Sequence, residues 1–64
     1  MIVKYNQEFD VIYIKLMDTN ISESKEFQPG IYIDYDDEGN IIGIEIPEAS
    51  KKTRQPNRII YEFA

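Results

Sequence analysis

The side chains with the clearest chemical potential are acidic and lie in the middle of the chain. The stretch reads Asp34-x-Asp36-x-Glu38-Gly39-x5-Glu45, which is the spacing of oxygen ligands and glycine in a calcium-binding loop between two helices. The flanking segments instead alternate with the period of β-strands, and Pro47 would interrupt an exiting helix. We therefore interpret the stretch as a hairpin turn. The candidates for weak binding of a cation or small ligand are Asp34, Asp36, Glu38 and Glu45.

Residue types on which many enzymes depend are missing from the chain. Its 64 residues include no His and no Cys, which excludes a Ser–His triad, a thiolate nucleophile, a zinc–thiolate site and a disulfide. Paired carboxylates can hydrolyse a glycosidic bond, but that reaction needs a cleft and one carboxyl group with a raised pKa. A domain of this size offers little cleft, so we expect no catalytic residue, no cofactor and no enzyme activity.

An acidic body and a basic tail divide the net charge of −5. Residues 1–50 carry 11 acidic and 3 basic side chains, a net charge of −8, and residues 51–64 carry 4 basic and 1 acidic, a net charge of +3. Nucleic acids and anionic membranes repel such a body. No apolar run exceeds four residues, whereas a membrane-spanning helix needs roughly 20. We expect a cytoplasmic protein that binds neither nucleic acid nor membrane.

The apolar residues favour a β-fold. The chain has twelve Ile, five Tyr, three Phe and two Val against one Leu and two Ala, and strands prefer the first group. Short turns separate runs that alternate with a period of two, and connections this short make neighbouring strands antiparallel. The less regular alternation of 21–27 indicates an edge or exposed strand. The prediction is a mostly β, antiparallel five-strand meander over residues 2–5, 10–16, 21–27, 31–35 and 41–46.

The remaining residues complete a single small domain that covers 1–64. Pro47 stands where helices tend to begin, so the sequence predicts a short helical turn near 47–52 after a meander that spans 1–50. Residues 51–58 are polar and basic and are typical of a linker. The last segment, 59–64, alternates again and predicts a C-terminal strand over 59–63.

Apolar side chains occur on both sides of the predicted strands. Alternation assigns one set to a core face, which contains Ile12, Ile14, Leu16, Ile31, Ile33, Ile42 and Ile44. A single sheet with little helix cannot cover two such faces, so we expect a homo-oligomer, most simply a dimer. The interface candidates belong to the opposite set and to the terminal strand: Val11, Tyr13, Tyr32, Ile41, Ile59, Tyr61 and Phe63.

Two signatures stand out in residues 1–50. They are Tyr5-x-x-Glu8-x-Asp10-x-Ile12-Tyr13-Ile14-x-Leu16 and Pro29-Gly30-Ile31-x-x-Asp34-Tyr35-Asp36-x-x-Gly39-Asn40-Ile41-Ile42-Gly43-Ile44-Glu45-Ile46-x-x-Ala49-Ser50. Together they resemble a family of short prokaryotic proteins known as domain of unknown function 2283. The resemblance implies a small β-rich fold and brings no catalytic residue. Some relatives are encoded beside small toxin-like proteins, which implies an antitoxin or partner-binding role for the family.

The leading hypothesis is a non-enzymatic interaction protein that self-associates and binds a basic protein partner. Its basis is the two-faced sheet together with the acidic body, because opposite charges favour the encounter of two proteins. The alternative is a small-ligand or cation-binding module that uses the 34–45 hairpin, and an enzyme of unknown class ranks third.

Overall fold

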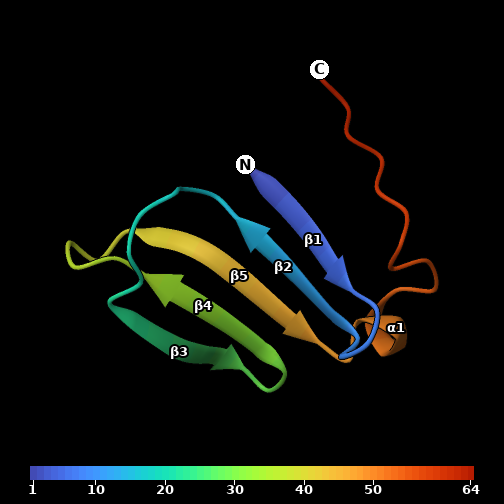
Figure 1. Cartoon of the computed structure of the whole chain (residues 1–64), viewed down its shortest axis with the longest axis horizontal. Coiled ribbons are helices and arrows are strands. Elements are labelled where there is room, and N and C mark those ends of the chain that lie inside the picture. The colour runs from blue at the N-terminus through green and yellow to red at the C-terminus, as the bar shows by residue number, and fades with distance from the viewer.

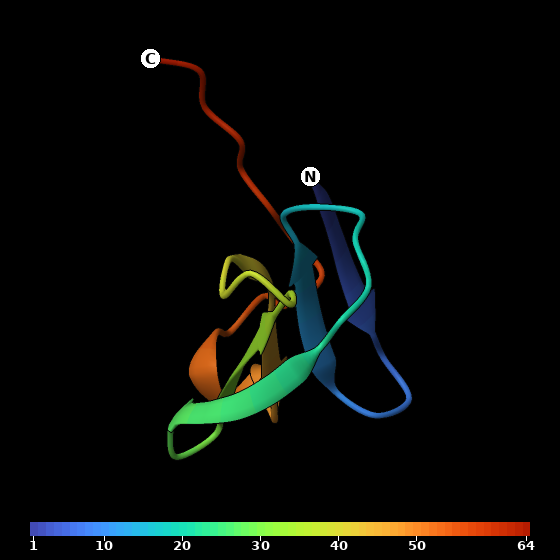
Figure 2. The same ribbon diagram turned by 90° about the vertical axis from the view of Figure 1, so that its left-hand side faces the viewer.

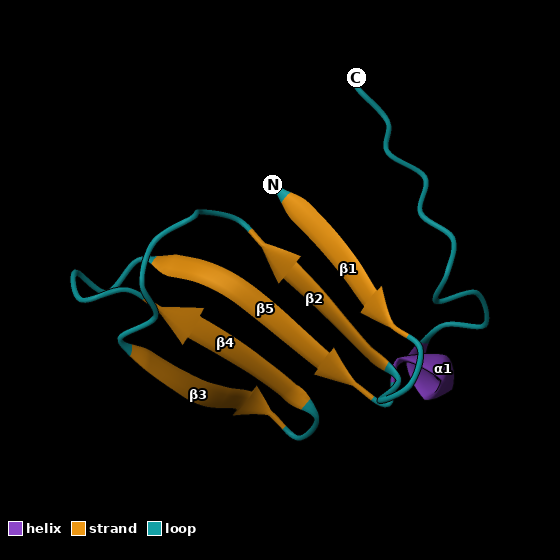
Figure 3. Cartoon of the chain, viewed as in Figure 1, coloured by secondary structure: helices purple, strands orange, loops and turns teal.

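Five β-strands and one short helical turn form the protein in a computed structural model that describes residues 1–64 (Figure 1; Figure 3). With a single helix of four residues, the protein has no helical segment that could span a bilayer. The elements are β1 (Ile2–Asn6), β2 (Val11–Lys15), β3 (Glu23–Gln28), β4 (Ile31–Tyr35), β5 (Ile41–Pro47) and α1 (Ala49–Lys52). The mostly β fold, the five strands and the helical turn are confirmed.

All five strands belong to one antiparallel sheet in the order β1-β2-β5-β4-β3. The strands are antiparallel as predicted, but the meander order is wrong, because β2 pairs with β5 rather than with β3. The seven residues 16–22 are long enough to carry the chain past β5 and β4 to the far edge (Figure 1). At that edge β3 is exposed along its whole length, which confirms the edge character of this segment.

The β2–β5 pairing brings apolar strands together in the middle of the sheet. It aligns Ile12 with Ile46 and Ile14 with Ile44, and β4 adds Ile33 beside Ile44. A meander would have placed β2 beside the polar β3 instead and left β5 at an edge. Burial of isoleucine against isoleucine is the physical reason for the observed order.

Local turn chemistry fixes the hairpins. Gly30 follows Pro29 with φ of 83°, and Gly39 ends the β4–β5 turn with φ of 84°, backbone conformations that side chains other than glycine's disfavour. Because both turns are short, β3 with β4 and β4 with β5 form adjacent antiparallel pairs.

The predicted C-terminal strand is absent. Residues 59–63 run as extended chain that pairs with no strand and project from the body (Figure 2). The cause is the turn at 55–58, in which the N–H of Arg58 donates to the carbonyl of Gln55 at 3.0 Å and directs the chain away from the sheet. The alternating pattern of this segment therefore has no partner within its own chain.

The chain by itself has little interior. Five of its 64 residues are buried, among them Ile33, Ile42 and Ala49. Its accessible surface is 5336 Å², whereas a compact monomer of this mass exposes about 4,250 Å². Its radius of gyration is 12.4 Å, compared with about 11 Å for a compact chain of this length. The single layer thus leaves surface that a globular domain would cover.

Candidate interaction surface

One side of the sheet is apolar, and we call it the isoleucine face. Antiparallel register places on it the side chains of Val3, Tyr5, Ile12, Ile14, Ile33, Ile44 and Ile46. Within this set only Ile33 is buried, because no second layer of structure lies over the sheet. The face is therefore an apolar surface that remains partly in contact with water.

A groove of about 300 Å³ lies between the isoleucine face and the start of the C-terminal segment. The segment therefore lies beside this part of the sheet without closing onto it. The sheet contributes Val3, Tyr5, Ile12, Ile14 and Ile46 to the groove, and the segment contributes Thr53, Gln55, Pro56, Arg58 and Ile59.

Beyond the groove the chain continues as an apolar tail, residues 59–64. The exposed fractions are 62% for Ile59, 68% for Ile60, 75% for Tyr61 and 93% for Phe63. Three of the sequence-predicted interface residues thus lie on an unpaired segment, where their apolar surface faces water.

The opposite side of the sheet, which we call the tyrosine face, holds three of the other interface candidates. Tyr13 and Tyr32 flank Glu45 across β2, β5 and β4, and Val11 is opposite Pro47. The fourth candidate, Ile41, lies apart from them. It begins β5 beyond a register shift, is paired with Tyr35 and is 44% exposed.

A buried carboxylate organises the tyrosine face. Asp34 is 6% exposed, and its Oδ2 accepts a hydrogen bond from the Tyr13 hydroxyl at 2.8 Å, while its Oδ1 accepts one from the Ser24 hydroxyl. Gly43 makes room for this contact, since a Cβ there would lie 2.9 Å from Cζ of Tyr13. Burial, followed by the bond to Asp34, raises the pKa of Tyr13 to about 12. The polar groups of this cluster are thus satisfied within one chain.

The acidic hairpin candidates do not converge. Asp36 caps its own turn, accepting hydrogen bonds from the backbone of Glu38 at 2.9 Å and of Asn40 at 2.8 Å. The bonds from Asn40 are the main cause that lowers the pKa of Asp36. Asp34 lies in the hydroxyl cluster and Glu45 lies between two tyrosines, and no three acidic side chains are grouped to hold a metal ion. Cation binding at this hairpin stays a prediction that the geometry does not favour.

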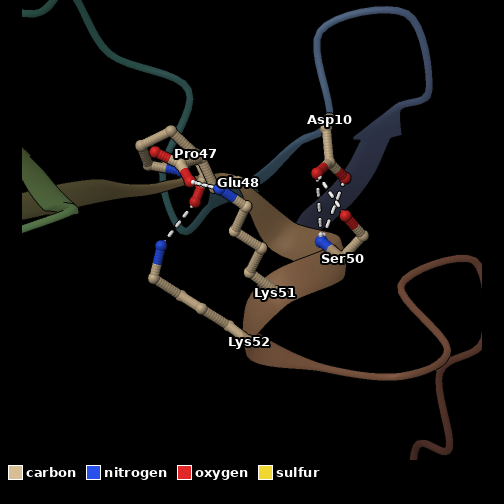
Figure 4. Close-up of polar contacts among 6 residues, drawn as sticks. All are labelled: Asp10, Pro47, Glu48, Ser50, Lys51 and Lys52. Carbon is tan, nitrogen blue, oxygen red and sulfur yellow. Dashed lines mark hydrogen bonds and ion pairs between the residues drawn. The ribbon is translucent and has the colours of Figure 1, made fainter.

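A second carboxylate, which the sequence offered only as a member of the N-terminal signature and as one of several acidic side chains, ties the β1–β2 hairpin to α1 (Figure 4). Asp10 has a left-handed φ of 56°, and its Oδ1 accepts hydrogen bonds from the Tyr5 hydroxyl at 2.8 Å and the Ser50 N–H at 3.0 Å. Its Oδ2 accepts one from the Ser50 hydroxyl at 2.6 Å. The Ser50 hydroxyl and then the Tyr5 hydroxyl lower the pKa of Asp10, and the same bond raises the pKa of Tyr5. We call this arrangement the Asp10 knot.

The first basic side chains after β5 are held locally. Nζ of Lys51 lies 2.8 Å from the carboxylate of Glu48, and Nζ of Lys52 donates to the carbonyl of Pro47 at 2.5 Å (Figure 4). These contacts and the Asp10 knot fix the direction in which the chain leaves β5.

Residues 2–50 match the family described as protein of unknown function DUF2283. The chain belongs to this family. The resemblance seen in the sequence is thereby confirmed, and with it the coarser conclusion of a small β protein whose family has no assigned function. No curated protein and no solved structure matches the chain.

The DUF2283 match covers all five strands and ends at Ser50. It therefore includes every partner in the Asp10 knot and in the Asp34 cluster. The basic linker and the apolar tail lie outside the matched residues.

Proposed function

We propose that this DUF2283 protein is a non-enzymatic interaction module that self-associates as a homodimer. The observation that carries the proposal is the partly uncovered isoleucine face on a chain with very little interior. The chain exposes about 1,100 Å² more than a compact monomer of its mass. A standard protein interface hides about 800 Å² on each partner, so one such contact accounts for most of the excess.

Chemistry favours the isoleucine face over the tyrosine face as the contact surface. On the tyrosine face the buried carboxylate and its two hydroxyl donors already satisfy one another, so a partner gains little by covering them. On the isoleucine face each half-exposed side chain gains by leaving water. The tail exposes three more apolar side chains, Ile59, Tyr61 and Phe63, which also gain by leaving water.

Sedimentation at micromolar concentration tests the proposal, with a pair of variants that separates the two faces. Val3 and Ile2 are neighbours on β1, are 37% and 48% exposed, and face opposite sides of the sheet. We expect Val3→Glu to weaken the dimer by about tenfold or more, and Ile2→Glu to leave it within about twofold, because only the first charge enters the contact. Far-UV circular dichroism checks that both variants fold. A wild-type mass equal to one chain would overturn the proposal.

A second candidate function is binding of a basic protein partner. The family resemblance implies such a partner, because an antitoxin binds a toxin-like protein. The observation that favours it is the charge of −8 on residues 1–50, which steers a positively charged protein toward the sheet. A native mass spectrum of the complex taken from the source cell tests it. A heavier species that dissociates as salt rises supports the partner, and recovery of the chain with copies of itself alone contradicts it.

A further inference from the structure

We propose that the tail of one copy adds to the free edge of β1 in a second copy as a sixth, antiparallel strand, and that the exchange is reciprocal. The inference rests on the proposed self-association and names the segment that makes the contact. In the assembly, residues 60–64 of each chain pair with Ile2–Asn6 of the other.

The tail has the composition and shape of a strand without a sheet. Ile59, Tyr61 and Phe63 alternate with Ile60 and Glu62, the segment contains no Gly or Pro, and its backbone is extended. β-branched and aromatic residues are those that a pleated surface prefers. Its apolar side chains are 62–93% exposed, so pairing with an edge would remove apolar surface from water and satisfy free backbone groups.

The two edges of the sheet differ in how well they accept a strand. The edge at β3 carries Glu23, Lys25 and Glu26, and its register shifts between Glu26 and Gln28, features that hinder strand addition. The edge at β1 has one charge, Lys4, and a regular register with β2. It also borders the apolar groove through Val3 and Tyr5. The β1 edge is therefore the acceptor.

Side-chain pattern selects one register. With Val3 opposite Phe63 and Tyr5 opposite Tyr61, the aromatic rings of the tail extend the isoleucine face. The same register sets Glu62 opposite Lys4 on the other face, where opposite charges attract across strands. A slip by one residue would turn Glu62 onto the apolar face, which is unfavourable.

The acceptor belongs to a second copy rather than to the same chain. Residues between 53 and 59 line the groove beside the isoleucine face, and Arg58 closes a turn on Gln55 through its N–H at 3.0 Å and its guanidinium at 3.3 Å. From this turn the tail diverges from its own β1 (Figure 2). The charge of +3 on residues 51–64 attracts the −8 body of either chain, so charge supports the pairing and the direction of the tail selects the second copy.

Disulfide trapping tests the pairing directly, because the chain has no cysteine of its own. One protein carries only Lys4→Cys and another only Glu62→Cys, and the two are mixed under mild oxidation. Cross-strand neighbours lie close enough for a disulfide. We expect a covalent heterodimer, which forms only between chains. A matched mixture of Glu8→Cys, in the β1–β2 turn, with Glu62→Cys should give at least about tenfold less product, since oxidation is selective for sulfurs held together.

The outcomes distinguish this inference from the proposed function. If the wild type is a dimer but the mixture gives no heterodimer above the control, the tail does not pair with β1 and the inference fails while self-association stands. If a chain carrying both substitutions closes on itself as a covalent monomer, the acceptor is its own β1 and the inference again fails. If the wild type is monomeric, self-association fails and the exchange with it.

A charge swap gives a second measurement that needs no cysteine. Lys4→Glu or Glu62→Lys alone places like charges opposite each other at both junctions of the dimer, so each should raise the dimer dissociation constant by about threefold to tenfold. The double variant restores opposite charges and should return the constant to within about twofold of wild type. Additive weakening in the double variant would contradict the register.

Discussion

The isoleucine and tyrosine faces belong to the same strands, yet they differ in whether the chain itself satisfies and covers their side chains. On the tyrosine face, Asp34, Tyr13 and Ser24 satisfy one another by hydrogen bonds, and no buried polar side-chain atom is left without a partner. On the isoleucine face the one polar side-chain group, the Tyr5 hydroxyl, is bonded to Asp10, and the remaining side chains are apolar and border an open groove. The polar groups of the tyrosine face are satisfied within the chain, whereas the isoleucine face keeps apolar surface that a second molecule would bury.

This difference indicates where specificity and where affinity arise in a small sheet. A buried, fully bonded carboxylate fixes strand register, because a slip would leave it unpaired. Apolar surface fixes no register but supplies most of the free energy of association. The two faces therefore predict opposite responses to mutation: the hydrogen-bonded cluster of Asp34, Tyr13 and Ser24 should affect folding alone, and the isoleucine face should affect assembly wherever the chain does not already cover it.

The largest expected effect on folding comes from the one place where the chain itself buries an isoleucine of β5. Ile42 is 1% exposed, and its carbonyl accepts hydrogen bonds from Leu16 at 2.8 Å and Met17 at 3.3 Å, which hold the β2–β3 connection against it. Ile42→Ala should lower the free energy of unfolding by about 2–5 kcal/mol. Its neighbour Ile41, 44% exposed, is the matched control, and Ile41→Ala should cost less than about 1 kcal/mol. Urea titration measures both, and equal costs would contradict the burial contrast.

A smaller effect on stability should come from the tyrosine face, with no effect on assembly. Tyr13→Phe removes one donor from the buried Asp34 and should cost about 1–3 kcal/mol. The control is Tyr32→Phe, because the Tyr32 hydroxyl makes no hydrogen bond within the chain, and its cost should be near zero. Sedimentation should give the same dimer constant for both variants and wild type. A dimer constant weakened by Tyr13→Phe would place the interface on this face.

The same residue gives an alkaline signature. The folded pKa of Tyr13, about 12, lies above its ordinary value of 10.0. The folded state therefore holds the proton more tightly, and the stability this contributes is present below pH 10 and is lost as the pH rises through 12. In an ultraviolet titration, the tyrosine that ionises at the highest pH should be missing from Tyr13→Phe and still present in Tyr32→Phe.

The sequence predicted the features that depend on residues near one another in the chain, and it missed those that depend on residues far apart. Alternation and turn residues act locally, and they identified the strands, the hairpin turn at 37–40 and the helical turn. The order of the strands in the sheet depends on whether β2 pairs with β5 or with β3, and the seven-residue connection 16–22 allows either pairing. Only the match of Ile12 and Ile14 with Ile46 and Ile44, more than 29 residues away, decides it.

Both carboxylate clusters lay beyond sequence reasoning for the same reason. Tyr13 and Asp34 are 21 residues apart, and Asp10 and Ser50 are 40 apart, so their contacts follow from register and not from spacing. Two signals were available. An aspartate inside the strand run 31–35 needs a partner once that strand is buried, and Gly43 inside the run 41–46 indicates a close approach by a neighbouring group.

The smallest expected effect concerns the Asp10 knot, which ties α1 to the β1–β2 hairpin and so orients the segment that lines the groove. The folded state lowers the pKa of Asp10 below its ordinary value of 3.8. The unfolded chain thus binds the proton more readily, and the contribution of Asp10 is present above pH 3.8 and is lost as the pH falls through the folded pKa. Asp10→Asn should therefore give a lower melting temperature at neutral pH and a shallower decline of that temperature with acid. Asp37→Asn, an equal charge change on an exposed turn, should leave both unchanged. If the knot also sets the direction of the tail, Asp10→Asn should reduce the trapping of Lys4→Cys by Glu62→Cys at neutral pH, and unchanged trapping would confine the role of Asp10 to stability.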